Sequence, residues 1–298
     1  MRRCLALTAI IFLTILLTPP LVGATSATRG ISSSERSRQI LLREVVINEF
    51  VATPTGMENI ELYNTRSYSI NLKGWRIEVS IGASPNVLVI EEDYLLAPHS
   101  FVKVRQFFPD WPSSGKGWIP NYGATITLYD SSDAKQDEVS YGIFGPAPAP
   151  PYRGSTARVS DGYSSGEDTY DWNVCFSPTL GSSNNGSVAD VKLGESPVVL
   201  NELYPGDDAD HTNSFVELYN KGTSTVDLDG WRILCVSRAK GSDYVELTAY
   251  DEISAKGFFV VPETRFPDYF VVDFTYTCVY LLNDEGERVD QVLSLIHI

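Results

Sequence analysis

The sequence contains one pattern twice, in the same order and at nearly constant spacing. The matching stretches are an apolar strand, a Glu-Leu-Tyr-Asn motif and a Gly-Trp turn: Val45–Phe50 with Val198–Leu203, Glu61–Asn64 with Glu217–Asn220, and Leu72–Ile77 with Leu228–Ile233. Similarity that keeps its order while only the intervening segments change length indicates a duplicated domain. We therefore expect two related folding units.

Each copy has the pattern of a β protein. Short runs rich in Val, Ile, Tyr and Phe alternate with clusters of Gly, Pro, Ser, Asn and Asp, which is typical of strands joined by turns. The pattern predicts an all-β fold with two antiparallel sheets packed face to face in each copy, and Trp75, Trp172 and Trp231 in the cores. At Gly230 the apolar positions change sides, which predicts a bulge or a crossing between sheets.

Taken together, these motifs resemble the lamin tail domain family. The resemblance rests on the Ile-Asn-Glu opening strand, the Glu-Leu-Tyr-Asn strand, the Leu-x-Gly-Trp turn and, in the first copy, the ending Ser177–Asn184. It implies two immunoglobulin-like β-sandwich domains in tandem. It also implies an exported or cell-surface protein, because microbial members are mostly of that kind and are sometimes fused to hydrolases.

The N-terminus has the order of a secretory signal peptide. Arg2 and Arg3 precede an apolar run and then small residues that end at Ala24, so we interpret residues 1–24 as a cleaved signal. The run is shorter than the ~20 residues of a membrane-spanning helix, although an uncleaved anchor is the alternative. Residues 25–41 are predicted to be a disordered spacer, and no later segment has the character of a membrane span.

The repeat also defines the domain boundaries. We predict a first sandwich at 42–184, a linker at 185–197 and a second, incomplete sandwich at 198–292. Residues 293–298 match the translated end of a common sequencing adapter and are interpreted as an artefact, with a genuine apolar final strand as the alternative. The second copy lacks counterparts of Tyr141–Asn184, so we expect an exposed core and marginal stability there.

Charge and motifs argue against several functions. The formal net charge is −15 at pH 7, and an acidic surface repels phosphate backbones, which disfavours general nucleic-acid binding. The sequence contains no Gly-x-Ser-x-Gly elbow, no His-Glu-x-x-His motif and no phosphate-binding Gly-Lys-Ser/Thr loop. We therefore predict that the chain is not an enzyme and that it uses no cofactor, apart from the calcium considered below. A nuclear scaffold role, by analogy with lamins, is contradicted by the signal pattern, the acidity and the lack of coiled-coil heptads.

Recurring acidic residues are the best candidates for chemistry. Glu49 and Glu202 each follow an Asn in the opening strand of a copy, and Glu61 and Glu217 lie on the next strand. Two carboxylates on neighbouring strands could form a catalytic pair or bind a cation. The alternative, which we favour, is that each Glu bonds an Arg or a backbone amide at the end of a sheet.

One acidic loop is a candidate calcium site. Asp207, Asp208 and Asp210, together with Glu217, offer several oxygen ligands close in sequence, as Ca²⁺ requires. The loop lacks the glycine and the regular alternation of known calcium loops, so a solvated turn is the alternative.

An aromatic segment of the first copy is a candidate interaction surface. Phe107, Phe108, Trp111 and Trp118 lie in or beside one predicted loop, where aromatic side chains can form a partner surface. The alternative is a loop that folds back onto its own sandwich.

Three cysteines remain after removal of the signal, so at most one intrachain disulfide can form. Cys235 and Cys278 fall on predicted strands of the same copy and are the expected pair in an oxidising compartment. The alternative is that Cys175, Cys235 and Cys278 are all buried small apolar residues.

These features predict a non-catalytic interaction or adhesion module, secreted or held at the cell surface, that binds an unknown protein or cell-surface component. The alternative is the targeting region of a larger exported hydrolase, of nuclease or phosphoesterase type, whose catalytic domain would follow the last residue. The full-length gene distinguishes the two.

Overall fold

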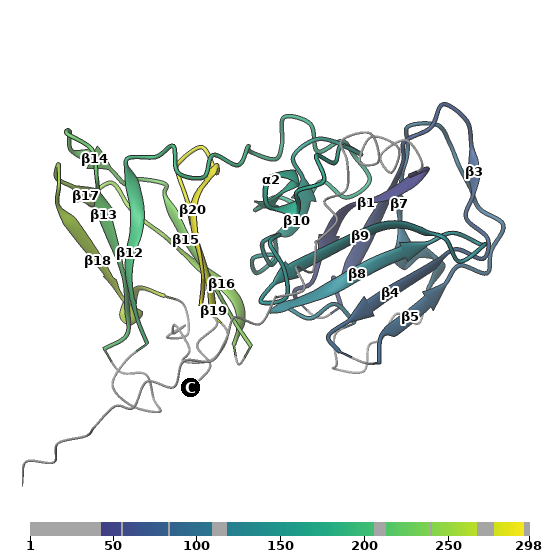
Figure 1. Cartoon of the computed structure of the whole chain (residues 1–298), viewed down its shortest axis with the longest axis horizontal. Coiled ribbons are helices and arrows are strands. Elements are labelled where there is room, and N and C mark those ends of the chain that lie inside the picture. The colour runs from purple at the N-terminus through teal and green to yellow at the C-terminus, as the bar shows by residue number, and fades with distance from the viewer. Residues whose placement is uncertain are drawn as a thin grey trace, which may run out of the picture.

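A computed structural model describes residues 43–54, 56–82, 84–108, 118–205, 213–238, 240–266 and 277–294. In this part of the chain nearly every element is a β-strand, and the strands form two sandwiches that lie side by side (Figure 1). The prediction of an all-β chain with two tandem sandwiches is confirmed. The predicted signal peptide and spacer lie outside the described residues.

The first copy packs a five-stranded sheet against a four-stranded sheet. The order is β11-β10-β1-β2-β7 in one sheet and β5-β4-β8-β9 in the other, and β3 and β6 form a short separate ladder. The elements are β1 (Val45–Val51), β2 (Asn59–Asn64), β3 (Ile70–Asn71), β4 (Arg76–Ser80), β5 (Asn86–Val89), β6 (Leu95–Leu96), β7 (Phe101–Lys103), the 3₁₀ helix η1 (Val104–Phe107), β8 (Gly123–Tyr129), β9 (Lys135–Gly142), β10 (Ser155–Arg158), the single-turn helix α2 (Asp168–Asp171) and β11 (Trp172–Cys175).

The second copy repeats the order of β1 to β9. Its sheets are β12-β13-β18 and β16-β15-β19-β20, with β14 and β17 as the short ladder. The elements are β12 (Val198–Tyr204), β13 (Phe215–Asn220), β14 (Val226–Asp227), β15 (Arg232–Ser237), β16 (Gly241–Glu246), β17 (Glu252–Ile253), β18 (Phe258–Pro262), the 3₁₀ helix η2 (Glu263–Arg265), β19 (Thr277–Leu282) and β20 (Arg288–Ser294). Among the described strands none corresponds to β10 or β11, in agreement with the repeat.

The segment interpreted as adapter sequence is described only at its start. Leu293 and Ser294 continue β20 by pairing with Cys278 and Thr277. Residues 295–298 lie outside the described part of the chain, and the origin of the segment stays a prediction.

The Asn-Glu dipeptides coincide with an irregularity in both opening strands. The pairing of β1 with β2 shifts between Ile47 and Glu49, and the pairing of β12 with β13 shifts between Leu200 and Glu202. A bulge sets two successive residues against one residue of the partner strand. In β1 both Asn48 and Glu49 are buried.

The glycines before Trp75 and Trp231 mark a crossing between sheets. In the second copy, β14 pairs with β17, whereas β15 pairs with β16 and β19, and Gly230 lies between the two strands. Gly74 and Gly230 have φ values of +78° and +76°, which glycine adopts without steric cost. The predicted crossing is confirmed, and Trp75, Trp172 and Trp231 are buried as expected.

The four-stranded sheet of the second copy is covered on both faces. Ile233 and Cys235 lie in the core of their own sandwich, while the alternate positions on β15 and β19 join the hydrophobic cluster of the first copy. These alternate residues are Leu234, Val236, Cys278, Tyr280 and Leu282. The unbroken apolar run Ile233–Val236 is the sequence signal of a strand buried on both sides.

Polar and aromatic contacts complete the interface between the copies. The ring centroids of Phe176 and Tyr244 are 4.7 Å apart, and the guanidinium of Arg232 lies over Phe176 at 4.6 Å. Asn173 Nδ2 donates to the Gly286 carbonyl at 3.1 Å. The two sandwiches therefore form one packed unit.

The predicted linker also packs against both copies. Val188 is buried with Ala157 and Cys175 of the first copy. The backbone N–H groups of Lys192 and Gly194 donate to the carbonyls of Arg288 and Val289 in β20, at 2.9 and 3.1 Å.

Candidate functional site

The structure brings the acidic residues of the repeat together in the first copy. Glu49 and Glu61 are directly opposed across β1 and β2, and neither is exposed. Ser155 Oγ donates to Glu49 Oε1 at 2.5 Å, and Thr179 donates to the same carboxylate through its N–H and its hydroxyl, both at 2.9 Å. Glu49 therefore ties β1 to β10 and to the closing loop, Thr179–Asn184.

Asn48 and Asp161 extend this network. Asn48 Nδ2 donates to Glu61 Oε1 and to Asp161 Oδ1, both at 3.0 Å. The Gly181 amide donates to the second oxygen of Glu61, and the Asn184 amide donates to Asp161 Oδ1 at 3.0 Å. Three carboxylates thus accept hydrogen bonds that hold the closing loop against the opening strands.

Glu61 is the most perturbed acid of the network. Burial raises the pKa of its carboxyl group from 4.5 to about 7; hydrogen bonds from Asn48 and Gly181 oppose the rise, and the charges of Glu49 and Asp161 add to it. A carboxyl group that titrates near neutrality is typical of catalytic acids. Here the side chain has no exposed surface and both oxygens accept hydrogen bonds, so a substrate cannot reach it in this conformation.

A buried ion pair lies beside this network. Arg158 Nη2 lies 2.8 Å from Asp137 Oδ2, and neither side chain is exposed. Arg158 Nε donates to the Ile47 carbonyl at 2.7 Å, and the guanidinium lies 4.4 Å from the ring centroid of Trp172. The other oxygen of Asp137 accepts from Arg43 at 2.8 Å. The sequence analysis did not identify Arg158, and the available signal was an arginine that follows the small residues Ser155, Thr156 and Ala157.

In the second copy the same acids are open to solvent. Asn201 Nδ2 donates to Glu217 Oε1 at 2.7 Å, which repeats the bond between Asn48 and Glu61. Asn201 and Glu202 are nevertheless exposed, and Glu217 is half-buried. The interpretation that each Glu stabilises the fold by bonding a backbone amide or an Arg therefore fits the first copy fully. It fits the second copy only in part.

The predicted calcium site falls mostly outside the described residues. Asp207, Asp208 and Asp210 lie outside the described residues, and Glu217 accepts a hydrogen bond from Asn201. Across the ranges that the structure describes, no group of three His, Cys, Asp or Glu residues could hold a metal ion. The calcium site stays a prediction.

Three of the four aromatic residues proposed as an interaction surface pack against the core. Phe107 is buried, and its ring meets that of Tyr94 edge-on at 5.0 Å. Phe108 and Trp118 are partly buried against the same cluster, and Trp111 lies outside the described residues. For these three side chains the arrangement matches the alternative of a loop folded back onto its own sandwich.

The expected disulfide between Cys235 and Cys278 is wrong for this fold. The strands β15 and β19 are neighbours, but Cys235 pairs with Val279 and Cys278 pairs with Val236. Because side chains alternate along a strand, Cys235 points into the core of the second copy and Cys278 points toward the first. Both are free thiols, as is Cys175, and all three are buried.

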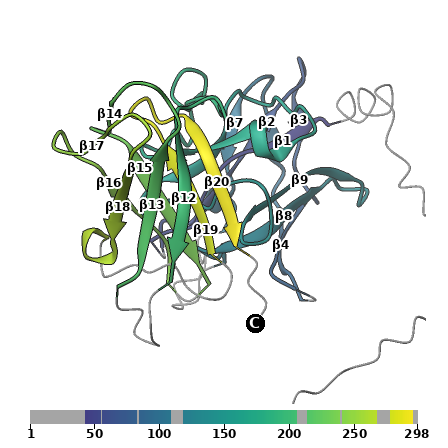
Figure 2. The same ribbon diagram turned by 60° about the vertical axis from the view of Figure 1, so that its left-hand side comes forward.

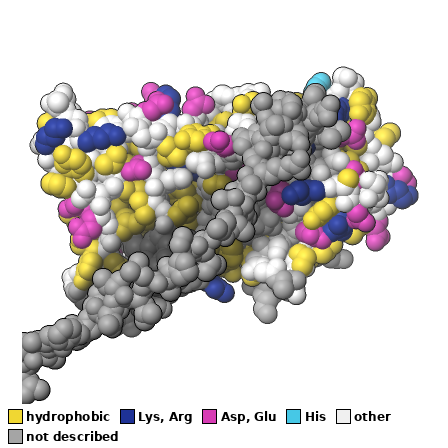
Figure 3. Space-filling model, viewed as in Figure 1, with side chains coloured by type: hydrophobic (Ala, Val, Ile, Leu, Met, Phe, Trp, Pro, Cys, Tyr) yellow, Lys and Arg dark blue, Asp and Glu magenta, His cyan; other side chains and the backbone are white. Residues whose placement is uncertain are grey.

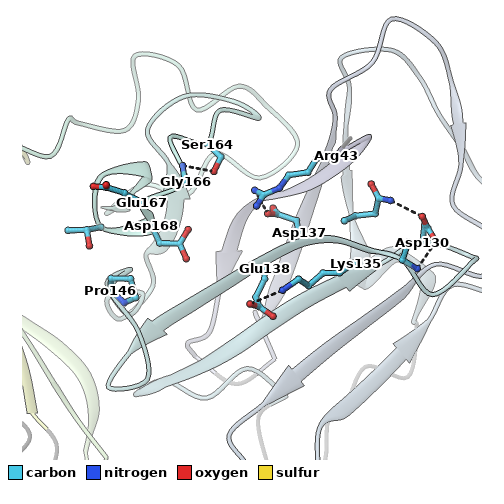
Figure 4. Close-up of a pocket in the computed structure, with 13 residues that line it drawn as sticks. Arg43, Asp130, Lys135, Asp137, Glu138, Pro146, Ser164, Gly166, Glu167 and Asp168 are labelled. Carbon is cyan, nitrogen blue, oxygen red and sulfur yellow. Dashed lines mark hydrogen bonds and ion pairs between the residues drawn. The ribbon is translucent and has the colours of Figure 1, made fainter. Parts of the chain in front are cut away.

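A cavity of about 950 Å³ opens between β9 and the segment that contains α2 (Figure 4). Most of the charges on its walls pair with each other: Arg43 with Asp137, and Lys135 with Glu138 at 3.2 Å. Burial raises the pKa of Asp168 at the same wall. None of the described residues that line the cavity is a histidine or a cysteine, so the cavity offers no nucleophile paired with a base of that kind.

The fold and the polar network define a class of protein: a tandem pair of immunoglobulin-like sandwiches whose central acids are used to build the fold. Comparison with family models identifies the family. The Lamin Tail Domain model matches residues 42–142 and again residues 193–294, and the chain belongs to this family. No curated protein matches the sequence.

Solved structures give only distant similarities. The chain is 12% identical to the exo-β-D-glucosaminidase CsxA over 79% of this chain and 25% of that one, with a TM-score of 0.20. For the exo-chitosanase CsxA of Amycolatopsis orientalis the identity is 11%, over 85% and 26% of the two chains, with a TM-score of 0.22. For red sea bream transglutaminase it is 9%, over 91% and 34%, with a TM-score of 0.20. The chain thus spans between 25% and 34% of the length of these proteins, and TM-scores this low carry no inference about it.

Within the described ranges, the helices are too short and too polar for any of them to cross a bilayer.

Proposed function

We propose that this chain is a non-catalytic interaction module that acts outside the cell or on its surface. The main support is the state of the acidic residues. In the first copy, Glu49, Glu61 and Asp161 are engaged by hydrogen bonds that attach the closing loop to the sheet. Acids that are occupied in this way build the fold, and the function of such a domain lies in the surface that the fold presents.

Other features support the location and the partner. The signal-peptide pattern at residues 1–24 favours export, and an acidic chain of net charge −15 suits a soluble surface outside the cell. The interface between the copies holds the two sandwiches as one unit, which can present both surfaces to a single partner. The partner in this proposal is an unidentified protein or another component of the cell surface.

The absence of catalysis can be tested directly. The purified chain and its Glu61→Gln variant would be incubated with model phosphodiesters, phosphomonoesters and β-glycosides. We expect no turnover by either protein. Turnover by the wild-type chain that the variant loses would overturn the non-catalytic proposal.

Export and binding need a separate experiment. Tagged chains with and without residues 1–24 would be expressed, and the tag would be sought in the medium and on intact cells by protease accessibility. Labelled purified chain would then be added to intact cells and followed by flow cytometry, with protease-treated cells as the control. Retention inside the cell, or no saturable attachment to untreated cells, would contradict the proposal.

The alternative is a targeting region of a larger exported hydrolase of nuclease or phosphoesterase type. Both versions predict binding by the tandem sandwiches. Recovery of the full-length gene separates them, because a following catalytic domain favours the alternative, whereas further repeats or an anchor favour the adhesion module.

A further inference from the structure

Only one asparagine of this chain is followed directly by a glycine. This is Asn185, which precedes Gly186. Both residues are exposed, in the turn that comes directly after the closing loop. The closing loop is attached to acids of β1 and β2, which lie side by side in the first copy (Figure 2). The pair therefore faces solvent next to the network that completes the first sandwich.

The backbone nitrogen of Gly186 is open to reaction. Within the described ranges no acceptor takes its N–H group. The turn is closed instead by the N–H groups of Ser187 and Val188, which donate to the Asn184 carbonyl at 2.9 and 3.1 Å. Gly186 has a φ value of +75°, and no atom beyond its neighbours lies within 4 Å of the position that a β carbon would take. Glycine adopts this conformation without strain, so the nitrogen is both uncrowded and unpaired.

The side-chain carbonyl of Asn185 is polarised by two donors. The Asp161 N–H donates to Asn185 Oδ1 at 3.1 Å, and the Ser160 hydroxyl donates to the same oxygen at 3.2 Å. Donors of this kind stabilise the negative charge that a carbonyl oxygen gains when a nucleophile adds to its carbon. The fold thus places an activated amide carbon one residue away from an open nitrogen.

The adjacent asparagine is protected from the same chemistry. Asn184 has no exposed surface, and its Nδ2 donates to the carbonyls of Asn48 and Arg158, both at 3.1 Å. Its Oδ1 accepts from the Thr179 hydroxyl at 2.6 Å. The residue that follows it is Asn185, whose β carbon crowds the attacking nitrogen in a way that glycine does not. The chain therefore contains a reactive asparagine and a locked one side by side.

A negative charge at residue 185 would fall beside acids that hold the closing loop. Asp161 binds the Asn185 side chain through its N–H, and its carboxylate accepts the Asn184 N–H at 3.0 Å. The charges of Glu49 and Asp161 already raise the pKa of Glu61, and a further carboxylate adds to this repulsion. Asp and Glu side chains are spread over the surface of both copies (Figure 3), so the charge would enter an already acidic chain.

We propose that Asn185 is a site of spontaneous deamidation, in which the Gly186 nitrogen attacks the side-chain amide and the product loosens the closing loop. The nitrogen gives its proton to hydroxide and bonds to Cγ of Asn185. The bond from Cγ to Nδ2 breaks, and Nδ2 leaves as ammonia with a proton from water. Water then opens either carbonyl of the five-membered succinimide, which yields aspartate or isoaspartate. The sum is one water consumed and one ammonia released, and the first step is intramolecular because the two groups belong to adjacent residues.

The test uses the purified full chain, kept folded in a mildly alkaline buffer and sampled over days. Deamidation should raise the mass of the tryptic peptide 159–192 by about 1 Da, and fragmentation should assign the change to Asn185. The change should be faster at higher pH, because the attacking nitrogen must lose its proton. Asn185→Gln should show no change, since its longer side chain does not close a five-membered ring. Ser160→Ala should slow the reaction roughly two- to tenfold, because one donor to Oδ1 is lost, whereas Ser224→Ala, at an exposed serine of the second copy, should not.

Hydrogen exchange measures the effect on the closing loop. In the aged chain and in Asn185→Asp, the amides of Gly181 and Asn184 should exchange faster than in the fresh wild type. No mass gain at Asn185, an equal gain at Asn184, or a gain that appears only after unfolding in urea would overturn the proposal. A rate that Ser160→Ala leaves unchanged would contradict activation by the fold, and unchanged exchange at Gly181 would contradict the loosening of the loop.

Discussion

Arg158 and Asp137 form an ion pair, 2.8 Å long, in which neither side chain has any exposed surface. The pair joins β10 to β9 and therefore links the two sheets of the first copy. Charges removed from water in this way are costly unless each has a partner. The first copy has this contact, and the described part of the second copy has no counterpart of Arg158.

Replacement of Arg158 by Met should destabilise the first copy by about 3–5 kcal/mol, because Asp137 is left charged and buried with only Arg43 as a cationic partner. The measurement is urea denaturation, with unfolding monitored by fluorescence. Lys73→Met removes an exposed ion pair with Asp93 and should cause no measurable change. An Arg158→Met variant as stable as the wild type would show that the pair contributes nothing.

The raised pKa of Glu61 predicts a specific dependence of stability on pH. The folded pKa is about 7 and the ordinary value is 4.5, so between these values the unfolded chain releases its proton while the folded chain retains it. The contribution of Glu61 to the free energy of unfolding is therefore fully present below pH 4.5 and is lost as the pH rises to 7. Relative to Glu61→Gln, the wild-type free energy of unfolding should fall on the order of 3 kcal/mol across this window. Denaturation curves from pH 4.5 to 8 measure it, and parallel pH profiles for the two proteins would contradict it.

The contact between the copies can be broken at a single side chain of the interface. Val236 lies on the face of β15 that joins the first copy's cluster, so Val236→Asp places a charge in the interface at a cost of roughly 3 kcal/mol or more. We expect the two sandwiches to separate, which small-angle scattering would record as a larger radius of gyration. Val260→Asp, at an exposed position on β18, is the matched control, and equal radii for both variants would argue against a tight interface.

The cysteines should remain reduced even in an oxidising buffer. Burial raises the pKa of the Cys278 thiol to about 12 and raises that of Cys235 further, so neither supplies a thiolate at neutral pH. Ellman's reagent should not react with either thiol in the folded protein and should react with both after denaturation. Intact mass after incubation with oxidised glutathione provides a second readout. Loss of two hydrogens from the native chain would mean that the strand faces are assigned incorrectly.

The cysteine pair shows where sequence reasoning failed. Both residues were correctly placed on strands of the same copy, but their facing depends on the register of β15 against β19. A shift of one residue in register moves a side chain to the other face of a sheet. The sequence alone does not specify that register, because both strands are apolar at successive positions.

The sequence predicted more of the acidic network than of the cysteine arrangement. The repeated Asn-Glu and Glu positions identified Glu49 and Glu61, and the favoured interpretation as partners of backbone amides matches the bonds to Thr179 and Gly181. Asp161 and the ion pair of Arg158 with Asp137 were missed. Their contacts join residues 21 or more positions apart in sequence. No local sequence pattern predicts a contact over such a separation.

The sequence by itself determined that this chain is a duplicated, all-β protein with tryptophans in its cores and with a bulge or a crossing at Gly230, since these features follow from local periodicity and from glycine's access to positive φ. Only the tertiary structure decided that the two copies share an interface, that the cysteines face apart, and that Asp137 pairs with Arg43 and Arg158. Those outcomes depend on which strands become neighbours in space. Burial, and the energetic cost of each unpaired charge, is set by those neighbours and not by the order of residues along the chain.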